Sequence, residues 1–405
     1  MRIAFIAANE FHPWGGSEVL WAAAAERLVQ RGLQVIVSAK DWGAPIKQIE
    51  HLRSIGCRIF LRPAPSLARR AIRKFPPWRD YPRRHLAKIS SSADLIVISQ
   101  SMNSDGLTWM EAARSRGLRY APIAHTAAES CWPDDDLADR LTRSYDSATA
   151  SYFVSEATLE LSRRQFGAPL RNARIVRNPF NVSYNAHLEW PPSDCGEFSL
   201  ACVGRLEVVQ KAQDVLLEVL SLPHWRKRDI RVSLVGKGAN ERSLRRLAAN
   251  LGLSNVQFSG FTDNIEKIWA THHALILPSR HEGLPLALVE AMLCGRPAIA
   301  TDVGGIRELL HDNLNGFLVK APTVELLDET MNRAWENRRR LREMGQQAAL
   351  DVRKFVSTDP VEDFVHELLT LIKSRVPVSE PAAASPQTSK STPGFQEGGA
   401  SSPLK

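Results

Sequence analysis

Short apolar runs alternate along this chain with longer stretches in which apolar residues recur at helical spacing. Strands that are apolar throughout, each followed by an amphipathic helix, are typical of parallel sheets with helices on both faces. The runs form two successive sets, which predicts an α/β protein of two doubly wound domains. The predicted strands are residues 3–8, 34–38, 58–61, 95–99, 121–124 and 151–154, then 199–203, 231–235, 256–259, 274–277 and 298–300.

A polar segment with Pro191 and Pro192 separates the two sets and predicts a domain boundary. The predicted domains are residues 1–187 and 198–358, followed by a closing helix at 359–375. Residues 376–405 are rich in Pro, Ser, Ala and Gly, which is typical of a disordered tail. The chain contains no run of about 18 apolar residues, so we expect neither a membrane span nor a signal peptide.

The chain carries 52 Lys and Arg against 44 Asp and Glu, a balance that favours polyanionic partners. The segment from Arg62 to Lys88 is the most basic, with one acid and three interleaved aromatic residues. Cations meet anionic headgroups and aromatic rings sit at the interface when a protein binds a membrane surface. We therefore expect this segment to touch a membrane or a lipid-linked molecule. A solvated face and a nucleic-acid contact are the alternatives, and no nucleic-acid partner is expected.

The clearest candidate site follows the predicted strand at 274–277. Pro285 suits the first turn of the next helix, and Gly295 suits its left-handed end. The free N–H groups at the start of that helix would attract an anion. Glu282 in the loop and Glu290 in the helix only accept hydrogen bonds when ionised, so they suit the hydroxyls of a sugar or ribose. The alternative is a surface glutamate before an ordinary amphipathic helix.

Two cations, Arg205 and Lys211, follow the first strand of the second set. Placed on one loop at the carboxyl end of a strand, they can hold a diphosphate and stabilise the negative charge that grows on it as a leaving group. The alternative is a pair of solvated surface cations. Gly236 and Phe261 follow two further strands and are weaker candidates for a ligand-binding turn.

In the first set, Gly15 and Gly16 follow the first strand and allow the backbone to approach a ligand closely. Ser17 is a candidate N-cap for the helix that follows. The spacing G-x-G-x-x-G is absent, which argues against a dinucleotide site. His125 ends a predicted strand, where an isolated histidine serves either structure or a ligand.

The segment 277–305, with two glutamates separated by seven residues, resembles the signature of the family 4 (group 1) glycosyltransferases. This resemblance implies the GT-B fold, in which two Rossmann-like domains face each other across a cleft. It places the donor on the C-terminal domain and the acceptor on the N-terminal domain. One departure is Ala212, where the family commonly has a glycine after the lysine.

The resemblance also implies roles for single residues. Arg205 and Lys211 would contact the donor diphosphate, Glu282 would orient the transferred sugar, and Glu290 would orient the ribose. His125 would touch the sugar from across the cleft. The further donor-binding positions implied are Gly15, Gly16, Gly236, Phe261, Gly283, Leu284, Pro285 and Leu286.

The implied activity is transfer of a sugar, with retention at the anomeric carbon, from a nucleoside-diphosphate sugar to a glycan or lipid-linked acceptor. A role in surface polysaccharide synthesis, in the cytoplasm or at the inner face of the membrane, is expected. No metal or other cofactor is expected, because the motifs at the phosphate site contain no paired aspartates to hold a cation. A nucleotide-sugar epimerase of the same fold and a non-catalytic nucleotide- or glycan-binding protein are the alternatives.

Overall fold

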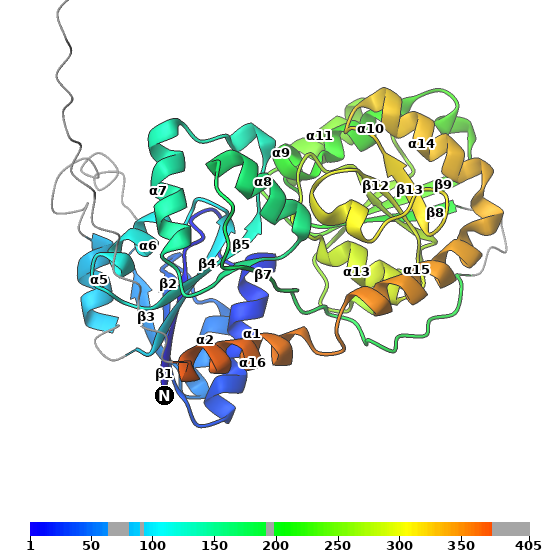
Figure 1. Ribbon diagram of the computed structural model, residues 1–405. Helices are drawn as coiled ribbons and strands as arrows, with labels where there is room; N and C mark the ends of the chain where they lie inside the picture. The colour runs from blue at the N-terminus through cyan, green and yellow to red at the C-terminus, as the bar shows by residue number, and fades with distance from the viewer. Residues whose placement is uncertain (64–80, 90–92, 192–197, 375–405) are drawn as a thin grey trace, which may run out of the picture.

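A computed structural model describes residues 1–63, 81–89, 93–191 and 198–374 of the chain. Its strands form two parallel sheets, one of seven strands and one of six, with helices on both faces of each (Figure 1). The first sheet lies within residues 1–187 and the second within 198–358. The prediction of two doubly wound sheets is therefore confirmed. The predicted tail at 376–405 lies outside the described residues.

The first sheet has the strand order β3-β2-β1-β4-β5-β6-β7. Ile3 of the interior strand β1 pairs with Val35 of β2 on one side and Leu95 of β4 on the other, so apolar residues lie side by side across the sheet. Its strands are β1 (Arg2–Ala7), β2 (Gln34–Lys40), β3 (Arg58–Arg62), β4 (Leu95–Met102), β5 (Tyr120–Thr126), β6 (Ser151–Phe153) and β7 (Ala173–Ile175). Its helices are α1 (Gly16–Gln30), α2 (Lys47–Ser54), α5 (Tyr81–Ile89), α6 (Leu107–Arg114), η1 (Glu129–Cys131), α7 (Asp135–Asp146) and α8 (Glu156–Phe166).

The second sheet has the order β10-β9-β8-β11-β12-β13, again with its earliest strand near the centre. Its strands are β8 (Phe198–Val203), β9 (Ile230–Val235), β10 (Val256–Gly260), β11 (Ala274–Leu277), β12 (Ala298–Thr301) and β13 (Gly316–Val319). Its helices are α9 (Val208–Lys211), α10 (Gln213–Ser221), η2 (Trp225–Lys227), α11 (Glu241–Asn250), α12 (Ile265–Trp269), α13 (Leu286–Leu293), η3 (Gly304–Glu308), α14 (Val324–Glu336), η4 (Arg338–Arg340) and α15 (Leu341–Phe355).

The last described helix, α16 (Pro360–Lys373), returns to the first domain and packs on α1 (Figure 1). Phe364 is buried there and meets Tyr152 edge to face, with ring centroids 5.3 Å apart. Arg27 of α1 donates to Asp359 at the start of α16 over 2.6 Å. The C-terminal segment therefore ties the second domain back to the first, on the side of the sheet that α1 covers.

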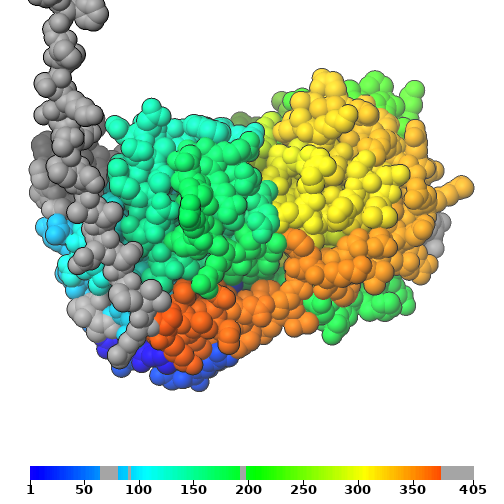
Figure 2. Space-filling view, in the orientation of Figure 1, coloured from blue at the N-terminus to red at the C-terminus, as the bar shows by residue number. Residues whose placement is uncertain are grey.

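The two domains touch along the carboxyl ends of their strands. The turn η3 lies against α8, as the yellow and green segments do in Figure 2. Glu308 of η3 accepts a hydrogen bond from the backbone N–H of Ala157 over 3.0 Å and lies 3.3 Å from Nη2 of Arg177. An acidic side chain from one domain thus caps the first turn of a helix in the other.

Candidate active site

A groove opens between the domains, with walls from both. The first domain contributes the loop after β5 and the first turns of α8, and the second contributes α9 and the loops after β11 and β12. Because parallel strands end at one edge of each sheet, the loops that carry the sequence motifs gather here. The groove is lined by residues 127–130, Ala157, Thr158, Leu161, Arg164, Val209, 280–282 and 302–304.

Lys211 and Glu282 form a largely buried ion pair at this groove, with 13% of the Lys211 side chain exposed. Nζ of Lys211 donates to Oε1 of Glu282 over 2.5 Å, and the hydroxyl of Ser279 donates to the same oxygen over 2.7 Å. Glu282 is only 4% exposed. Lys211 ends the short helix α9, and the next residue, Ala212, adopts a left-handed φ of 49°. The glycine that the family commonly has at this position would take that conformation without strain.

Arg205 lies where the two domains meet. Its Nη2 donates to Oε1 of Gln210, in the short helix α9, over 2.9 Å and lies 3.4 Å from the carboxylate of Glu207, the N-cap of that helix. Its Nη1 reaches across to Nδ1 of His12 in the first domain, over 2.5 Å. Arg205 thus contacts the first domain, and Lys211 contacts Glu282 on the groove wall; His12 was not predicted as a partner.

Glycines let the motif loops pack backbone against backbone. A Cβ on Gly236 would lie 2.0 Å from the carbonyl oxygen of Gly204, and one on Gly304 would lie 1.9 Å from that of Glu282. Both glycines also have positive φ. A Cβ on Gly283 would lie 1.8 Å from the carbonyl oxygen of His125 in the opposite domain. Each of these distances is far shorter than the contact distance between a side-chain carbon and an oxygen. Any other residue at these positions would push the two backbones apart, so the geometry of the cleft depends on these glycines.

Helix α13 begins one residue later than the sequence suggests. Pro285 is extended, with ψ of 124°, and is the N-cap, so the helix starts at Leu286. The expectation that Pro285 occupies the first helical turn is therefore wrong by one position. Gly295 follows the helix with φ of 70°, as predicted for its left-handed end. The free N–H groups of the first turn therefore begin at Leu286, two residues after the buried Leu284.

Glu290 lies in the second turn of α13 and is 3% exposed. The backbone and side-chain amides of Asn181 both donate to its Oε1, over 2.9 and 2.7 Å. Burial raises the pKa of Glu290 to about 7, against the hydrogen bonds from Asn181, which lower it. Both bonds end on Oε1, so Oε2 is the atom placed to accept from a ligand hydroxyl.

His125 is the penultimate residue of β5 and is buried. Its Nδ1 lies 3.0 Å from the carbonyl oxygen of Gln100, so Nδ1 carries the proton and donates. Burial lowers the pKa of His125 to about 4, which leaves the ring neutral near pH 7. Among the described residues, its Nε2 has no partner at hydrogen-bond geometry, although the side chain of Asn178 lies close enough to raise its pKa. A buried acceptor without a partner is costly unless a ligand satisfies it.

The loop before α1 differs from its prediction in one respect. Gly15 is the N-cap of α1, and Ser17 lies inside the helix, where its hydroxyl donates to Glu18 over 2.8 Å. Ser17 is therefore not the cap. Gly16 faces the second domain, since a Cβ there would lie 4.0 Å from Cδ1 of Leu286. Phe261 is 66% exposed.

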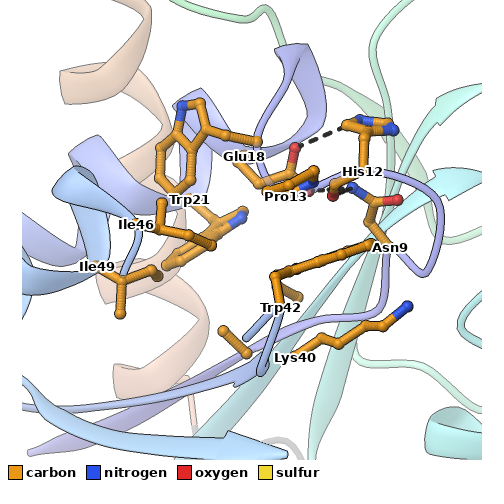
Figure 3. Close-up of a pocket in the computed structure, with 12 residues that line it drawn as sticks. Asn9, His12, Pro13, Glu18, Trp21, Lys40, Trp42, Ile46 and Ile49 are labelled. Atoms are coloured by element: carbon orange, nitrogen blue, oxygen red, sulfur yellow. Dashed lines mark hydrogen bonds and ion pairs between the residues drawn. The ribbon is translucent and has the colours of Figure 1, made fainter. Parts of the chain in front are cut away.

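Three polar side chains that the sequence did not single out converge beside this loop, as Figure 3 shows. Glu18 is buried, and its carboxylate accepts from Nδ2 of Asn9 over 3.1 Å. Nε2 of His12 faces the other carboxylate oxygen at 3.9 Å. Burial raises the pKa of Glu18 to about 7. The only signal in the sequence was their position around the glycine pair, with Asn9 and His12 before it and Glu18 after it.

The basic segment is only partly described, because residues 64–80 lie outside the described ranges. Arg62 is buried rather than at the surface, and its Nη1 donates to the carbonyl oxygen of Ser38 over 2.8 Å. Its inclusion in a surface patch was therefore wrong. Arg83 and Lys88 of α5 are exposed. Over the described ranges, no helix combines the length and apolarity needed to cross a membrane.

Two family profiles match the chain. One, described as "Glycosyl transferases group 1", matches residues 191–351, and the other, described as "Glycosyltransferase Family 4", matches residues 14–184. The chain is 30% identical to EpsD of Bacillus subtilis over 156 residues, which is 38% of this chain and 41% of that protein. It is 23% identical to the D-inositol 3-phosphate glycosyltransferase of an Arthrobacter species, over 84% of this chain and 86% of that protein.

The chain spans less than half the length of each of the first four curated relatives it matches. Among solved structures, it resembles HepE of Anabaena in complex with UDP-glucose, with a TM-score of 0.70 and 19% identity. That match covers 91% of this chain and 99% of HepE. The likeness confirms the GT-B fold predicted from the sequence.

Proposed function

Because the chain belongs to the group 1 glycosyltransferases of family 4, we propose that it transfers a sugar from a nucleoside-diphosphate sugar to an acceptor hydroxyl, with retention at the anomeric carbon. Its structural neighbour HepE has been solved with UDP-glucose. The proposal places the donor on the second domain and the acceptor in the groove between the domains.

The observation that carries the proposal is the buried pair of Lys211 and Glu282 on the wall of the interdomain groove, with Arg205 beside it. A buried ion pair contributes little to stability on balance, because its desolvation offsets its attraction. Its position is better explained by a ligand that needs both charges. Lys211 and Arg205 suit a diphosphate, and the carboxylate of Glu282 suits sugar hydroxyls.

The same groups would act most strongly as the bond to the sugar breaks. Negative charge then grows on the departing diphosphate, and Arg205, Lys211 and the N–H groups at the start of α13 stabilise it. These groups are already fixed by packing and hydrogen bonds, so little reorganisation is required. The exposed ring of Phe261 would stack on the nucleobase, and Oε2 of Glu290 would accept from a ribose hydroxyl.

Retention fits a front-face displacement in this cleft. The acceptor hydroxyl approaches on the side from which the diphosphate departs, and a phosphate oxygen accepts its proton. Glu282 is held by Lys211 and Ser279, which suits it to bind hydroxyls rather than to attack carbon. The neutral His125 would accept a hydrogen bond from the sugar at Nε2. The mechanism needs no metal ion.

The groove favours an acceptor without charge near the reacting hydroxyl. Its apolar lining comes from alanine, valine and leucine side chains on both walls. Its charged side chains have partners of opposite charge, namely Arg164 with Glu129, Arg280 with Asp214, Asp302 with Arg307, and Glu282 with Lys211. A glycan or the sugar part of a lipid-linked acceptor suits such a lining. Synthesis of a surface polysaccharide near a membrane is the setting we propose.

The test is a transfer assay with UDP-, GDP- and ADP-glucose in the presence of EDTA, with oligosaccharide and lipid-linked sugar acceptors. One donor should release its diphosphate only when an acceptor is present, and proton NMR should show the donor's anomeric configuration in the product. Lys211→Ala should abolish the release. Conversion of the donor sugar without an acceptor would favour an epimerase, and an inverted product would contradict retention.

A further inference from the structure

The guanidinium of Arg205 is held from both domains. From its own domain, Gln210 of α9 and Glu207, the N-cap of α9, contact its Nη2 at 2.9 and 3.4 Å. His12 contacts Nη1 from the opposite domain at 2.5 Å. Among these partners, only His12 makes the direction of the guanidinium depend on how the two domains meet.

The imidazole of His12 accepts this hydrogen bond. A guanidinium only donates, so Nδ1 of His12 must be the acceptor and the ring proton must lie on Nε2. Burial and the nearby Arg205 lower the pKa of His12 to about 4, which is consistent with a neutral ring. The charged groups that face the ring or share its pocket are Glu18, Arg205 and Lys40, with Glu207 beyond Arg205.

The ring of His12 is oriented from behind. Its Nε2 faces Oε2 of Glu18 at 3.9 Å, and Asn9 donates both to the His12 carbonyl and to Glu18 (Figure 3). Gly15 makes room for the ring, because a Cβ there would lie 2.6 Å from Nε2. Since φ of Gly15 is −170°, any residue could adopt its backbone, so space is what this position requires. Gly15 thus leaves space for the His12 ring, in addition to letting the backbone approach a ligand.

We infer that His12 is a positioning residue, which aims the guanidinium of Arg205 at the donor diphosphate when the domains meet. The inference rests on the proposed function. Without His12, the partners that Arg205 keeps within the described part of the chain are Gln210 and the carboxylate of Glu207, so its guanidinium turns toward its own domain. His12 therefore makes the affinity of the second domain for a diphosphate depend on the first domain.

The test compares two substitutions of equal shape. His12→Asn keeps an acceptor near the place of Nδ1, whereas His12→Leu has the same size and no acceptor. Binding of UDP, GDP and ADP is measured by calorimetry, with thermal unfolding as a check on folding. For the diphosphate that the wild type binds, His12→Leu should weaken binding by about ten-fold, and His12→Asn should recover most of that loss.

The same two substitutions are then made in Arg205→Ala, where they should no longer differ, because their effect passes through Arg205. A difference that persists in that background, or equal binding by the two variants in the wild-type background, would overturn the inference. If the wild type binds none of the three diphosphates, the proposed function itself fails. If Arg205→Ala weakens binding but the His12 variants do not, only the positioning inference fails.

Discussion

Replacing Gly283 by alanine should separate binding of the donor from transfer. Gly283 lies between Glu282 and the start of α13, and its backbone faces the carbonyl oxygen of His125 in the other domain. Its φ is outside the range that favours glycine, so alanine can adopt the backbone there. The substitution therefore acts through a steric overlap between the two domains, and not through backbone strain at residue 283.

The size of the effect follows from the distance. The added Cβ would lie 1.8 Å from the carbonyl oxygen of His125 and 3.0 Å from Cγ2 of Val154. Ordinary contact needs roughly 3.5 Å, so the two walls must separate by about 1.7 Å at this point. A misplacement of about 1 Å can lower a rate by about 100-fold. We expect a loss of that order in kcat, a Tm close to wild type, and a fall in diphosphate affinity no larger than the roughly ten-fold expected when the contact of His12 with Arg205 is lost.

Gly345→Ala is the matched control. Its Cβ would lie 2.1 Å from the carbonyl oxygen of Gly295, a similar overlap, but within the second domain. Overpacking inside a domain costs about 1–3 kcal/mol, so Gly345→Ala should lower Tm by several degrees. Its kcat at a temperature where it is folded should remain near wild type. Wild-type kcat in Gly283→Ala would refute the reasoning, because the contact between domains would then not belong to the reacting state.

Three further predictions concern the buried charges and the cleft histidine. Lys211→Met should lower the free energy of unfolding by about 3 kcal/mol, because Glu282 keeps a buried charge without its cation. In urea unfolding, the double variant with Glu282→Gln should recover most of the lost free energy, and no recovery would contradict the ion pair of Lys211 with Glu282. His125→Phe should lower kcat by about 10- to 100-fold with unchanged diphosphate affinity, since it removes the acceptor at Nε2; equal loss of affinity would argue against contact with the sugar. The folded pKa of Glu290, raised to about 7, means that the folded state keeps a proton that the unfolded state releases near pH 4.5. Stability should therefore fall by about 3 kcal/mol as pH rises from 4.5 to 7, and Glu290→Gln should remove that part of the pH dependence; identical pH profiles of unfolding would contradict the assignment.

The interior strands of both sheets could be predicted, because they are buried on both faces and therefore apolar throughout. The strands missed were β7 and β13, which lie at the edges of the two sheets. In β7, Arg174 is exposed between Ala173 and Ile175, so no apolar run marks the strand. In β13, the buried segment is short and begins with Gly316, a residue more typical of a turn.

The candidate site could be predicted where its residues share a local motif. Lys211 and Glu282 each follow a predicted strand, and the carboxyl ends of parallel strands lie at the same edge of a sheet, so the two side chains could be expected to meet. His12 could not be assigned to Arg205, because the two are far apart in sequence and meet only where the domains touch. Arg62 was misassigned because the backbone carbonyls that hold it, from β1 and β2, leave no pattern in the sequence.

The most direct test of the central claim is thermal unfolding of the wild type and of Lys211→Ala with UDP, GDP or ADP, in EDTA. A ligand that binds only the folded state stabilises it by about 4 kcal/mol at 1,000 times its Kd, which raises Tm by several degrees. We predict that one of the three diphosphates raises the Tm of the wild type and leaves that of Lys211→Ala unchanged. A cooperatively unfolding wild type that responds to none of them would contradict a nucleotide-sugar site at Lys211 and Glu282.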